Sequence, residues 1–219
     1  MSTFKTVLSI VFPIVVIGAV IWRSDINGWS SIPWVILSFG VSVIRRPFEQ
    51  ENKGNVIVDT RSVSVERFLL VLVAVGAFFL PLLHLLTGIF SRFDYTLGTI
   101  PTIAGIVLFL SGLWFFWRSH VDLGRNWSVT VELRENHSLI TQGVYKYIRH
   151  PMYSAIWLFQ LAQPLLLHNW IAGFTGPIAF GLMYVVRVPY EERMMRDKFG
   201  PDYDDYVART GRIWPRFAF

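Results

Sequence analysis

Cysteine is absent from this chain of 219 residues. Without a thiol there is no disulfide framework, no thiolate metal site and no cysteine nucleophile. Charged residues are scarce as well, since Asp, Glu, Lys and Arg make up 16% of the sequence, against roughly 25% in an ordinary soluble domain. The set AVILMFWYC accounts for 53%, and the mean hydropathy is +0.45. A globule with so few charges cannot cover its own surface, so the composition predicts an integral membrane protein and excludes a water-soluble enzyme.

The short signatures of several soluble enzyme classes are missing too. The chain has no G-x-G-x-x-G fingerprint, no G-x-x-x-x-G-K-[ST] loop, no H-E-x-x-H pair and no G-x-S-x-G elbow. Its histidines do not suggest a metal site. His84 falls within an apolar stretch, which favours a core role, while His120 and His168 have no partners at metal-ligand spacing. We therefore predict no bound metal.

The charge balance does not indicate a nucleic-acid partner. The formal net charge is +5 and the pI is about 9.7, but no basic run interleaved with exposed aromatic residues is present. In a membrane protein, basic residues accumulate on cytoplasmic loops. We therefore predict membrane lipids, and no nucleic acid, as the surroundings of the basic segments.

Long apolar stretches predict membrane-spanning helices. A bilayer core of about 30 Å needs roughly 20 apolar residues at a rise of about 1.5 Å each. Four stretches meet or approach this length: Phe4–Trp22, Ser31–Ile44, Phe68–Phe90 and Leu97–Trp117.

A fifth apolar region, Met152–Val188, is too long for one crossing. Pro164 and the polar pair His168-Asn169 stand near its middle, where a turn is least costly. We interpret the region as a helical hairpin, with one arm over Tyr153–Leu167 and the other over Trp170–Val188. The chain is therefore expected to cross the membrane five or six times.

The basic residues indicate an orientation. If the spans alternate, only Arg23 and Arg92 of the 20 Lys and Arg residues fall on one side of the membrane. The positive-inside rule then places the N-terminus, the 45–67 loop, the 118–151 segment and the C-terminus in the cytoplasm.

Two segments of about thirty residues each are expected to face water, Arg118–Pro151 and Pro189–Phe219. Each is too small for an independent nucleotide-binding domain. Any chemistry must therefore be built from both segments together with the ends of the last spans.

The first segment carries a cluster of aromatic and basic residues just before the hairpin. Pro151 stands where the hairpin helix should begin, a position that favours proline. The helix would then start directly after His150, leaving free backbone N–H groups and the positive end of the helix dipole there. An anionic group is able to dock at such an end. The alternative is an interfacial aromatic belt joined to a polar linker.

The second cluster begins at Arg187. Arg187 and Glu191 are four residues apart, so they share one face if a helix continues past Pro189. A charge at the membrane boundary is costly unless it is paired or lines a cavity. The alternatives are an Arg187 that extends to the lipid headgroups and ordinary juxtamembrane charges at Glu191 and Glu192.

The two clusters together resemble the isoprenylcysteine carboxyl methyltransferase family. The first motif runs from His137-Ser-Leu-Ile-Thr-Gln-Gly-Val-Tyr145 to Arg149-His150-Pro151-Met-Tyr153. The second is Arg187-x-x-x-Glu191-Glu192, followed by Phe199-Gly200-Pro-Asp-Tyr203-Asp-Asp-Tyr206. The resemblance covers about Leu123–Phe219, and its motifs occur in the family's order on either side of a hydrophobic hairpin.

The resemblance implies a membrane methyltransferase that uses S-adenosylmethionine without a Rossmann domain and releases S-adenosylhomocysteine. By position, Arg187 would bind the substrate and orient its carboxylate, and Glu191 and Glu192 would complete the catalytic group. The residues implied in cofactor binding are His137, Ser138, Leu139, Ile140, Tyr145, His150, Pro151, Tyr153 and Glu191.

The expected architecture is an all-α integral membrane protein whose last two spans form a hairpin beside a small cytoplasmic cofactor pocket and a C-terminal helix. Residues 1–117 would hold four spans and their loops. Residues 118–219 would form the methyltransferase core, with a cofactor loop at 118–151, the hairpin at 152–188 and a tail at 189–219.

The favoured acceptor is the carboxylate of an isoprenylated cysteine, reached from the bilayer and methylated at the cytoplasmic interface. One alternative is a phospholipid or small-molecule N-, O- or S-methyltransferase of the same fold. Another is an NADPH-dependent membrane reductase, in which Lys146 or Arg149 would bind the extra phosphate. A non-enzymatic membrane subunit or transporter is the last alternative, although transporters usually place ionisable residues within their spans.

Overall fold

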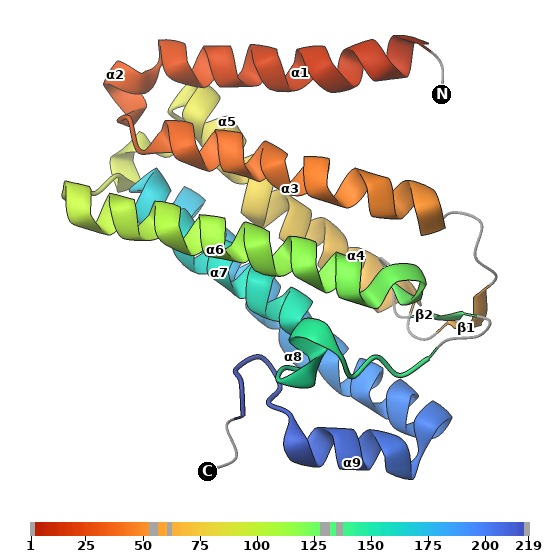
Figure 1. The fold of residues 1–219 in the computed structure, drawn as a ribbon. Helices are drawn as coiled ribbons and strands as arrows, with labels where there is room; N and C mark the ends of the chain where they lie inside the picture. Colours follow the sequence, from red (N-terminus) through yellow and green to blue (C-terminus); the bar gives the residue numbers. More distant parts are fainter. Residues whose placement is uncertain (1–2, 53–56, 61–62, 128–131, 135–137, 217–219) are drawn as a thin grey trace.

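The structure is a computed structural model that describes residues 3–52, 57–60, 63–127, 132–134 and 138–216. It is mostly helical, as expected (Figure 1). Its longer helices are α1 (Thr3–Trp22), α3 (Ser31–Glu51), α4 (Val63–Ala74), α5 (Leu80–Thr87), α6 (Thr99–Leu123), α7 (Pro151–Leu167), α8 (Trp170–Phe199) and α9 (Pro201–Arg209). The short elements are α2 (Ser24–Asn27), a π-helical segment η2 (Val75–Phe79), and the 3₁₀ turns η3 (Ser91–Phe93), η4 (Gly124–Asn126) and η5 (Gly143–Lys146).

One short sheet has to be added to the predicted all-α architecture. Strand β1 (Ile57–Thr60) pairs antiparallel with β2 (Glu132–Arg134), with a register shift between Ile57 and Asp59. The two segments are far apart in the sequence and each is only three or four residues long, so neither shows a recognisable alternating pattern by itself. The sheet joins the loop after α3 to the loop after α6 (Figure 1).

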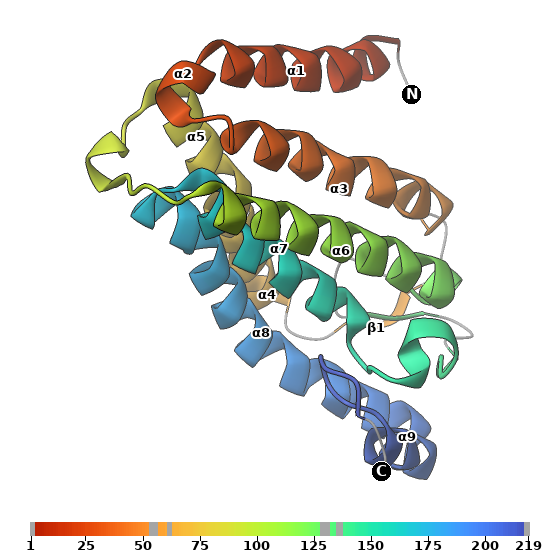
Figure 2. The same cartoon turned by 60° about the vertical axis from the view of Figure 1, so that its left-hand side comes forward.

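The helices run between two ends of the molecule (Figures 1 and 2). At one end, Arg23 Nε and Asn27 Nδ2 donate to the carbonyl of Leu85 at 3.1 and 2.8 Å. Asn169 Nδ2 donates there to Asp94 Oδ1 at 2.6 Å. The sheet, η4, η5 and α9 lie at the other end. The turns that carry Arg23 and Arg92 therefore lie opposite the basic-rich segments.

Among the described residues, three helical stretches are long and apolar enough to cross a membrane: Val65–Thr87, Thr99–Asn126 and Trp170–Phe199. They support the prediction of an integral membrane protein. The number of crossings and their orientation stay predictions.

Helices α7 and α8 pack antiparallel and are joined at His168-Asn169 (Figure 2). His168 adopts a left-handed conformation with φ of 51°, which ends α7. Asn169 caps α8, because its side-chain oxygen accepts from the backbone N–H groups of Ile171 and Ala172 at 3.0 and 2.8 Å. The chain therefore reverses at the polar pair that suggested a turn in the sequence.

Helix α8 continues without interruption through Pro189 to Phe199. The boundary expected between the hairpin and the tail at residue 188 therefore falls inside one helix. Because the helix is continuous, Arg187 and Glu191 lie one turn apart on the same face, as their spacing predicted.

The π-helical segment η2 is tied to the hairpin by polar side chains. The carbonyl of Gly76 accepts from Gln163 Nε2 at 3.1 Å and from Thr175 Oγ1 at 3.0 Å. A π turn disrupts the regular ladder of backbone hydrogen bonds, and in lipid every backbone polar group has to be satisfied within the protein. Gln163 and Thr175 provide the hydrogen bonds that satisfy the Gly76 carbonyl, and the same contacts hold η2 against α7 and α8.

A glycine allows α6 and α7 to approach closely. A Cβ atom at Gly112 would lie 2.7 Å from the ring of Phe159 and 3.0 Å from the carbonyl oxygen of Ala155. Phe159 also packs on Phe109 of α6, with ring centroids 4.7 Å apart. The site described below is built at one end of this pair of helices, so the spacing of α6 and α7 determines its shape.

We expect Gly112→Ala to lower the thermal stability of the protein in detergent. The added methyl group would overpack the α6–α7 contact, at a cost of about 1–3 kcal/mol, which outweighs the gain in helix propensity. The measurement is the midpoint of thermal unfolding. Gly18→Ala in α1 is the matched control, because its Cβ would meet nothing within 4 Å. Equal midpoints for the two variants would contradict the proposed close contact.

Candidate active site

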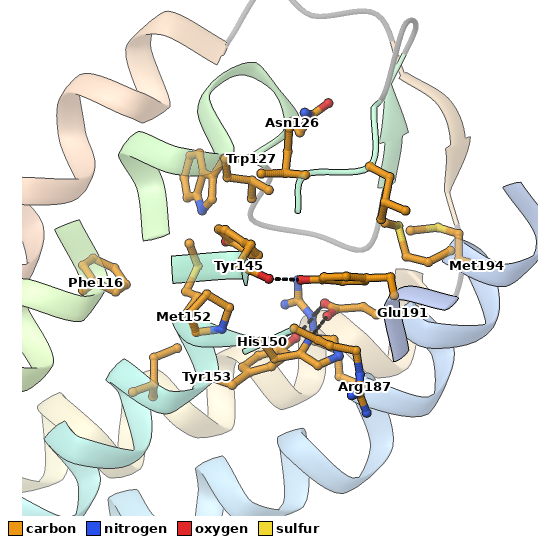
Figure 3. Close-up of a pocket in the computed structure, with 18 of the residues that line it drawn as sticks. Phe116, Asn126, Trp127, Tyr145, His150, Met152, Tyr153, Arg187, Glu191 and Met194 are labelled. Carbon is orange, nitrogen blue, oxygen red and sulfur yellow. Dashed lines mark hydrogen bonds and ion pairs between the residues drawn. The ribbon is translucent and has the colours of Figure 1, made fainter. Parts of the chain in front are cut away.

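A cavity of about 240 Å³ lies at the end of the bundle that carries η4, η5 and α9 (Figure 3). Its wall comes from α3, α4, α6, α7, α8, α9 and the segments between α6 and α7. Nine of the eleven residues that the sequence predicted at the site line it: Ser138, Leu139, Ile140, Tyr145, His150, Pro151, Tyr153, Arg187 and Glu191. Glu192 does not line it. His137, the remaining cofactor residue, lies outside the described residues.

Helix α7 begins at Pro151, as predicted, and its first turn forms part of the cavity wall. His150 is the residue before the helix, with φ of −122° and ψ of 60°, and Pro151 occupies the first turn. The first intrahelical bond runs from the Ser154 N–H to the His150 carbonyl at 3.1 Å. The backbone N–H groups of Met152 and Tyr153 precede it and have no intrahelical carbonyl to bond. This end of α7 therefore presents backbone donors and a positive dipole end.

A buried charge cluster lies beside that helix start. Arg187 Nε donates to Glu191 Oε1 at 2.7 Å, and the hydroxyl of Tyr153 donates to the same oxygen at 2.6 Å. Nη1 of Arg187 lies 3.2 Å from Oε1 of Glu66 in α4. The side chain of Arg187 is 11% exposed, so its charge is compensated by two carboxylates and not by water. Figure 3 shows Arg187, Glu191, Tyr153 and His150 converging from α7 and α8.

Glu192 makes a different set of contacts and is not among the residues that line the cavity. Its carboxylate accepts from Arg149 Nε at 3.2 Å, from Arg212 Nη2 at 2.9 Å and lies 3.3 Å from His150 Nε2. Arg149 also donates to the carbonyl of Thr210 at 2.5 Å. Glu192 therefore joins the segment before α7 to the segment after α9. Its hydrogen bond to Arg212 raises the pKa of that guanidinium above its usual range.

His150 links the two carboxylates of the motif. Its Nδ1 lies 3.6 Å from Glu191 Oε2, and its Nε2 lies 3.3 Å from Glu192 Oε1. The imidazole is therefore held between a carboxylate that borders the cavity and one that fastens the tail, which fixes the orientation of the ring.

Tyr145 reaches the cavity from the η5 turn. Its hydroxyl donates to the carbonyl of Ser119 at 3.4 Å, and its own carbonyl accepts from the hydroxyl of Tyr206 at 2.7 Å. Burial raises the pKa of Tyr145 far above its usual value, so the phenol stays protonated and serves as a neutral donor. Burial raises the pKa of Tyr206 in the same way.

The turn that presents Tyr145 depends on Gly143. Its φ is +59°, and a Cβ atom there would overlap the carboxylate of Asp122. That carboxylate accepts from the N–H of Val144 at 2.9 Å and from Arg118 at 2.7 Å. The backbone conformation and the nearby carboxylate therefore both require glycine at this position, two residues before Tyr145 in the motif.

Several lining residues were not assigned by sequence reasoning. Trp127 is 4% exposed, and its indole N–H makes no hydrogen bond within the described part of the chain. The guanidinium of Arg45 from α3 lies 5.5 Å from the Trp127 ring centroid. Asn126 Oδ1 accepts from the N–H of Ser138 at 3.2 Å. This bond fixes the start of the cavity-lining segment Ser138–Ile140, called the 138–140 strip below. Trp127 stood close to the first motif, whereas nothing in the local pattern around Arg45 indicated a site.

The other histidines have structural surroundings. His84 is buried, with its Nε2 3.4 Å from Asp94 Oδ1. His120 is buried with its Nδ1 2.7 Å from the carbonyl of Phe116. In the ranges that the structure describes, no group of three or more His, Asp or Glu side chains is arranged to hold a metal ion.

The cavity therefore has two chemically distinct parts. Arg187, Glu191, His150 and the α7 helix start make one part polar. The apolar part is lined by Leu70, Phe116, Met152, Ile156 and Met183. Such an arrangement suits a charged small molecule held next to the end of a lipophilic one.

We expect Glu192→Ala to loosen the C-terminal segment. It would leave Arg149 and Arg212 without their carboxylate, and the side chain of Arg149 is only 9% exposed. Removing one partner of a buried ion pair costs about 3 kcal/mol or more. The measurements are the thermal unfolding midpoint in detergent and the rate of proteolysis after α9.

Asp204→Asn is the control for that variant. It removes an exposed pair, in which Arg196 Nε lies 2.9 Å from Asp204 Oδ1, and such pairs contribute at most about 1 kcal/mol. If the Glu192→Ala protein were as stable and as protease-resistant as this control, Glu192 would not fasten the C-terminal segment.

Known proteins resemble this chain over part of its sequence. Residues 103–197 match the model of the isoprenylcysteine carboxyl methyltransferase (ICMT) family. Protein-S-isoprenylcysteine O-methyltransferase B of Arabidopsis thaliana is 30% identical over 92 residues, which are 41% of this chain and 47% of that protein. A cobalt-zinc-cadmium resistance protein of Cupriavidus metallidurans is 30% identical over 101 residues, or 46% of each chain. The match thus spans about half the length of these curated relatives.

The fold can be compared over more of the chain. A solved structure of a eukaryotic intramembrane Ras methyltransferase, an isoprenylcysteine carboxyl methyltransferase, superposes with a TM-score of 0.59 at 18% identity. The superposition covers 93% of this chain and 74% of the other. The resemblance of this integral membrane protein to the isoprenylcysteine carboxyl methyltransferase family is therefore confirmed, in sequence over residues 103–197 and in fold over most of the chain.

Proposed function

We propose that this protein is a membrane methyltransferase that moves the methyl group of S-adenosylmethionine to a lipophilic acceptor at the cytoplasmic interface. The carboxylate of an isoprenylated cysteine is the favoured acceptor. The observation that carries the proposal is the convergence of Arg187, Glu191, Tyr153 and His150 on one cavity at the end of an apolar bundle. These residues come from two motifs that stand far apart in the sequence.

The cavity fits the cofactor in the chemistry of its donors. The N–H groups at the start of α7 suit the cofactor's carboxylate. The carboxylate of Glu191 would offset the positive charge of the cofactor. Leu139 and Ile140 line the wall from the 138–140 strip, and the Trp127 indole offers a donor without a partner in the described chain. The bound cofactor supplies a methyl group on a positively charged sulfur.

The chain's own residues have to align and shield the reactants. Methyl transfer from a sulfonium is an in-line displacement that needs no nucleophilic side chain, so its main demand is orientation. A carboxylate acceptor is ionised at neutral pH and needs no strong general base. Arg187 orients it through hydrogen bonds to the guanidinium, while Glu191 and Glu66 hold Arg187 in place. The apolar wall keeps water away.

The apolar part of the cavity suits the lipophilic tail of the acceptor. Leu70 comes from α4, Ile156 from α7 and Met183 from α8. These helices also carry exposed apolar side chains on their outer faces, among them Val71 and Leu182, which suits contact with lipid. The acceptor would reach the cavity from the bilayer, and S-adenosylhomocysteine would leave on the cytoplasmic side.

Two observations disfavour the alternative of an NADPH-dependent reductase. Arg149 is engaged by Glu192 and by the carbonyl of Thr210, so its guanidinium is committed within the protein. Lys146 is not among the residues that line the cavity, and its Nζ lies 5.4 Å from the ring centroid of exposed Tyr147. Arg149 does line the cavity, but its guanidinium is already bonded to Glu192 and Thr210, and Lys146 lies outside the lining.

Calorimetric titration of the purified protein in detergent tests the proposed function. S-adenosylhomocysteine should bind with micromolar affinity, and NADPH in a parallel titration should not bind. Arg187→Lys should keep that binding and lower methyl transfer to N-acetyl-S-farnesylcysteine about 100-fold or more, because lysine keeps the charge but loses the planar fork that orients a carboxylate.

His150→Ala is the complementary variant in the same experiment. It removes a ring that borders the cavity next to the start of α7. It should therefore weaken S-adenosylhomocysteine binding about tenfold, which is the effect expected for the loss of one charge-assisted or well-placed hydrogen bond. Binding of NADPH alone would contradict the methyltransferase function. Equal loss of ligand binding and transfer in Arg187→Lys would contradict the acceptor role of Arg187.

The proposed orientation has a direct test, because the chain contains no cysteine. Single cysteines are introduced by Asp25→Cys between α1 and α3 and by Asp205→Cys in α9, both at exposed positions. A membrane-impermeant maleimide applied to intact cells should label the first variant, and inside-out vesicles should allow labelling of the second. Labelling of both from the same side would contradict the alternation of spans.

A further inference from the structure

The second carboxylate on Arg187 comes from a part of the chain that the family match does not include. Glu66 lies in the first turn of α4, and its Oε1 is 3.2 Å from Arg187 Nη1. The residue is 5% exposed. The matched region begins at residue 103, so neither motif points to Glu66.

The two carboxylates approach different nitrogens of the guanidinium. Glu191 accepts from Nε, and Glu66 lies against Nη1. Contacts to two nitrogens from two helices fix both the position of the guanidinium and the direction of its plane. One contact alone would leave the plane free to turn about that hydrogen bond.

Glu191 and Glu66 differ in their relation to the cavity. Glu191 lines it, whereas Glu66 is not among the lining residues. Leu70, one turn further along α4, does line the cavity, and Leu69 belongs to a buried cluster with Tyr153, Met183 and Val188. Glu66 is therefore held by a packed helix and contacts Arg187 from behind the cavity wall.

We propose that Glu66 is a positioning residue for Arg187, through which α4 sets the orientation of the acceptor. This role rests on the proposed methyltransferase function. Glu66 touches neither acceptor nor cofactor, and it acts by keeping the guanidinium plane turned toward the acceptor.

The charges predict a specific kinetic effect. Arg187 with two carboxylates carries a net charge of −1, so Glu66 lowers the attraction of Arg187 for an anionic acceptor while improving its alignment. Removing the charge of Glu66 should therefore leave acceptor binding equal or tighter and make the bound acceptor less well aligned. A salt bridge that merely fastens α4 to α8 would not separate the two effects.

The test compares Glu66→Gln and Glu66→Ala with the wild-type protein in detergent, using N-acetyl-S-farnesylcysteine as the acceptor. Glu66→Ala should lower kcat about tenfold and Glu66→Gln by less, since small misplacements of an orienting group cost up to about 100-fold in rate. The KM for the acceptor should not rise, and the Kd for S-adenosylhomocysteine should stay unchanged. Glu66→Gln, which keeps an oxygen acceptor for Nη1, should be the milder variant.

Asp204→Asn, which removes an exposed ion pair with Arg196, is the control and should keep wild-type kinetics. A wild-type kcat in both Glu66 variants would overturn the role, and so would a loss of S-adenosylhomocysteine binding parallel to the loss of kcat. A wild-type protein that binds no S-adenosylhomocysteine and transfers no methyl group would overturn the proposed function itself, and the role of Glu66 with it.

Discussion

The structure depends on compensating one buried positive charge. Arg187 stands where an apolar helix reaches the end of the bundle, and an uncompensated guanidinium there would be costly. Glu191 meets it from the same helix and Glu66 from α4. Tyr153 of α7 shares the Glu191 carboxylate. Satisfying this single charge therefore brings α4, α7 and α8 to one point, and that point borders the cavity.

A second carboxylate attaches the polar segments to the bundle. Glu192 follows Glu191 directly, yet it faces Arg149, His150 and Arg212. Adjacent residues on a helix point in directions about 100° apart, so two neighbouring glutamates are able to serve two separate clusters. One organises the cavity and the other fastens the segments before α7 and after α9. The described residues around Arg149 and Arg212 are held in place in this way.

The bundle itself supplies a rigid frame for these contacts. Gly112 allows Phe159 to pack closely on α6, and Gln163 and Thr175 satisfy the Gly76 carbonyl of the π-helical segment. Where lipid replaces water, close packing and internal hydrogen bonds take the place of the hydrophobic effect in holding helices together. The distances between these helices determine the dimensions of the cavity.

Local sequence determined much of this protein. Apolar length and composition predicted the membrane helices, Pro151 marked the start of α7, His168-Asn169 marked the reversal, and the four-residue spacing of Arg187 and Glu191 placed them on one face. Each of these is a property of residues close together in the chain, where helix periodicity and backbone preferences decide the outcome. Only the tertiary structure decided that Arg45 and Trp127 line the cavity and that Glu66 contacts Arg187 from α4. It also decided that β1 pairs with β2 and that Glu192 turns away from the cavity. These contacts depend on how whole helices pack, and no local pattern encodes which distant residue will meet another.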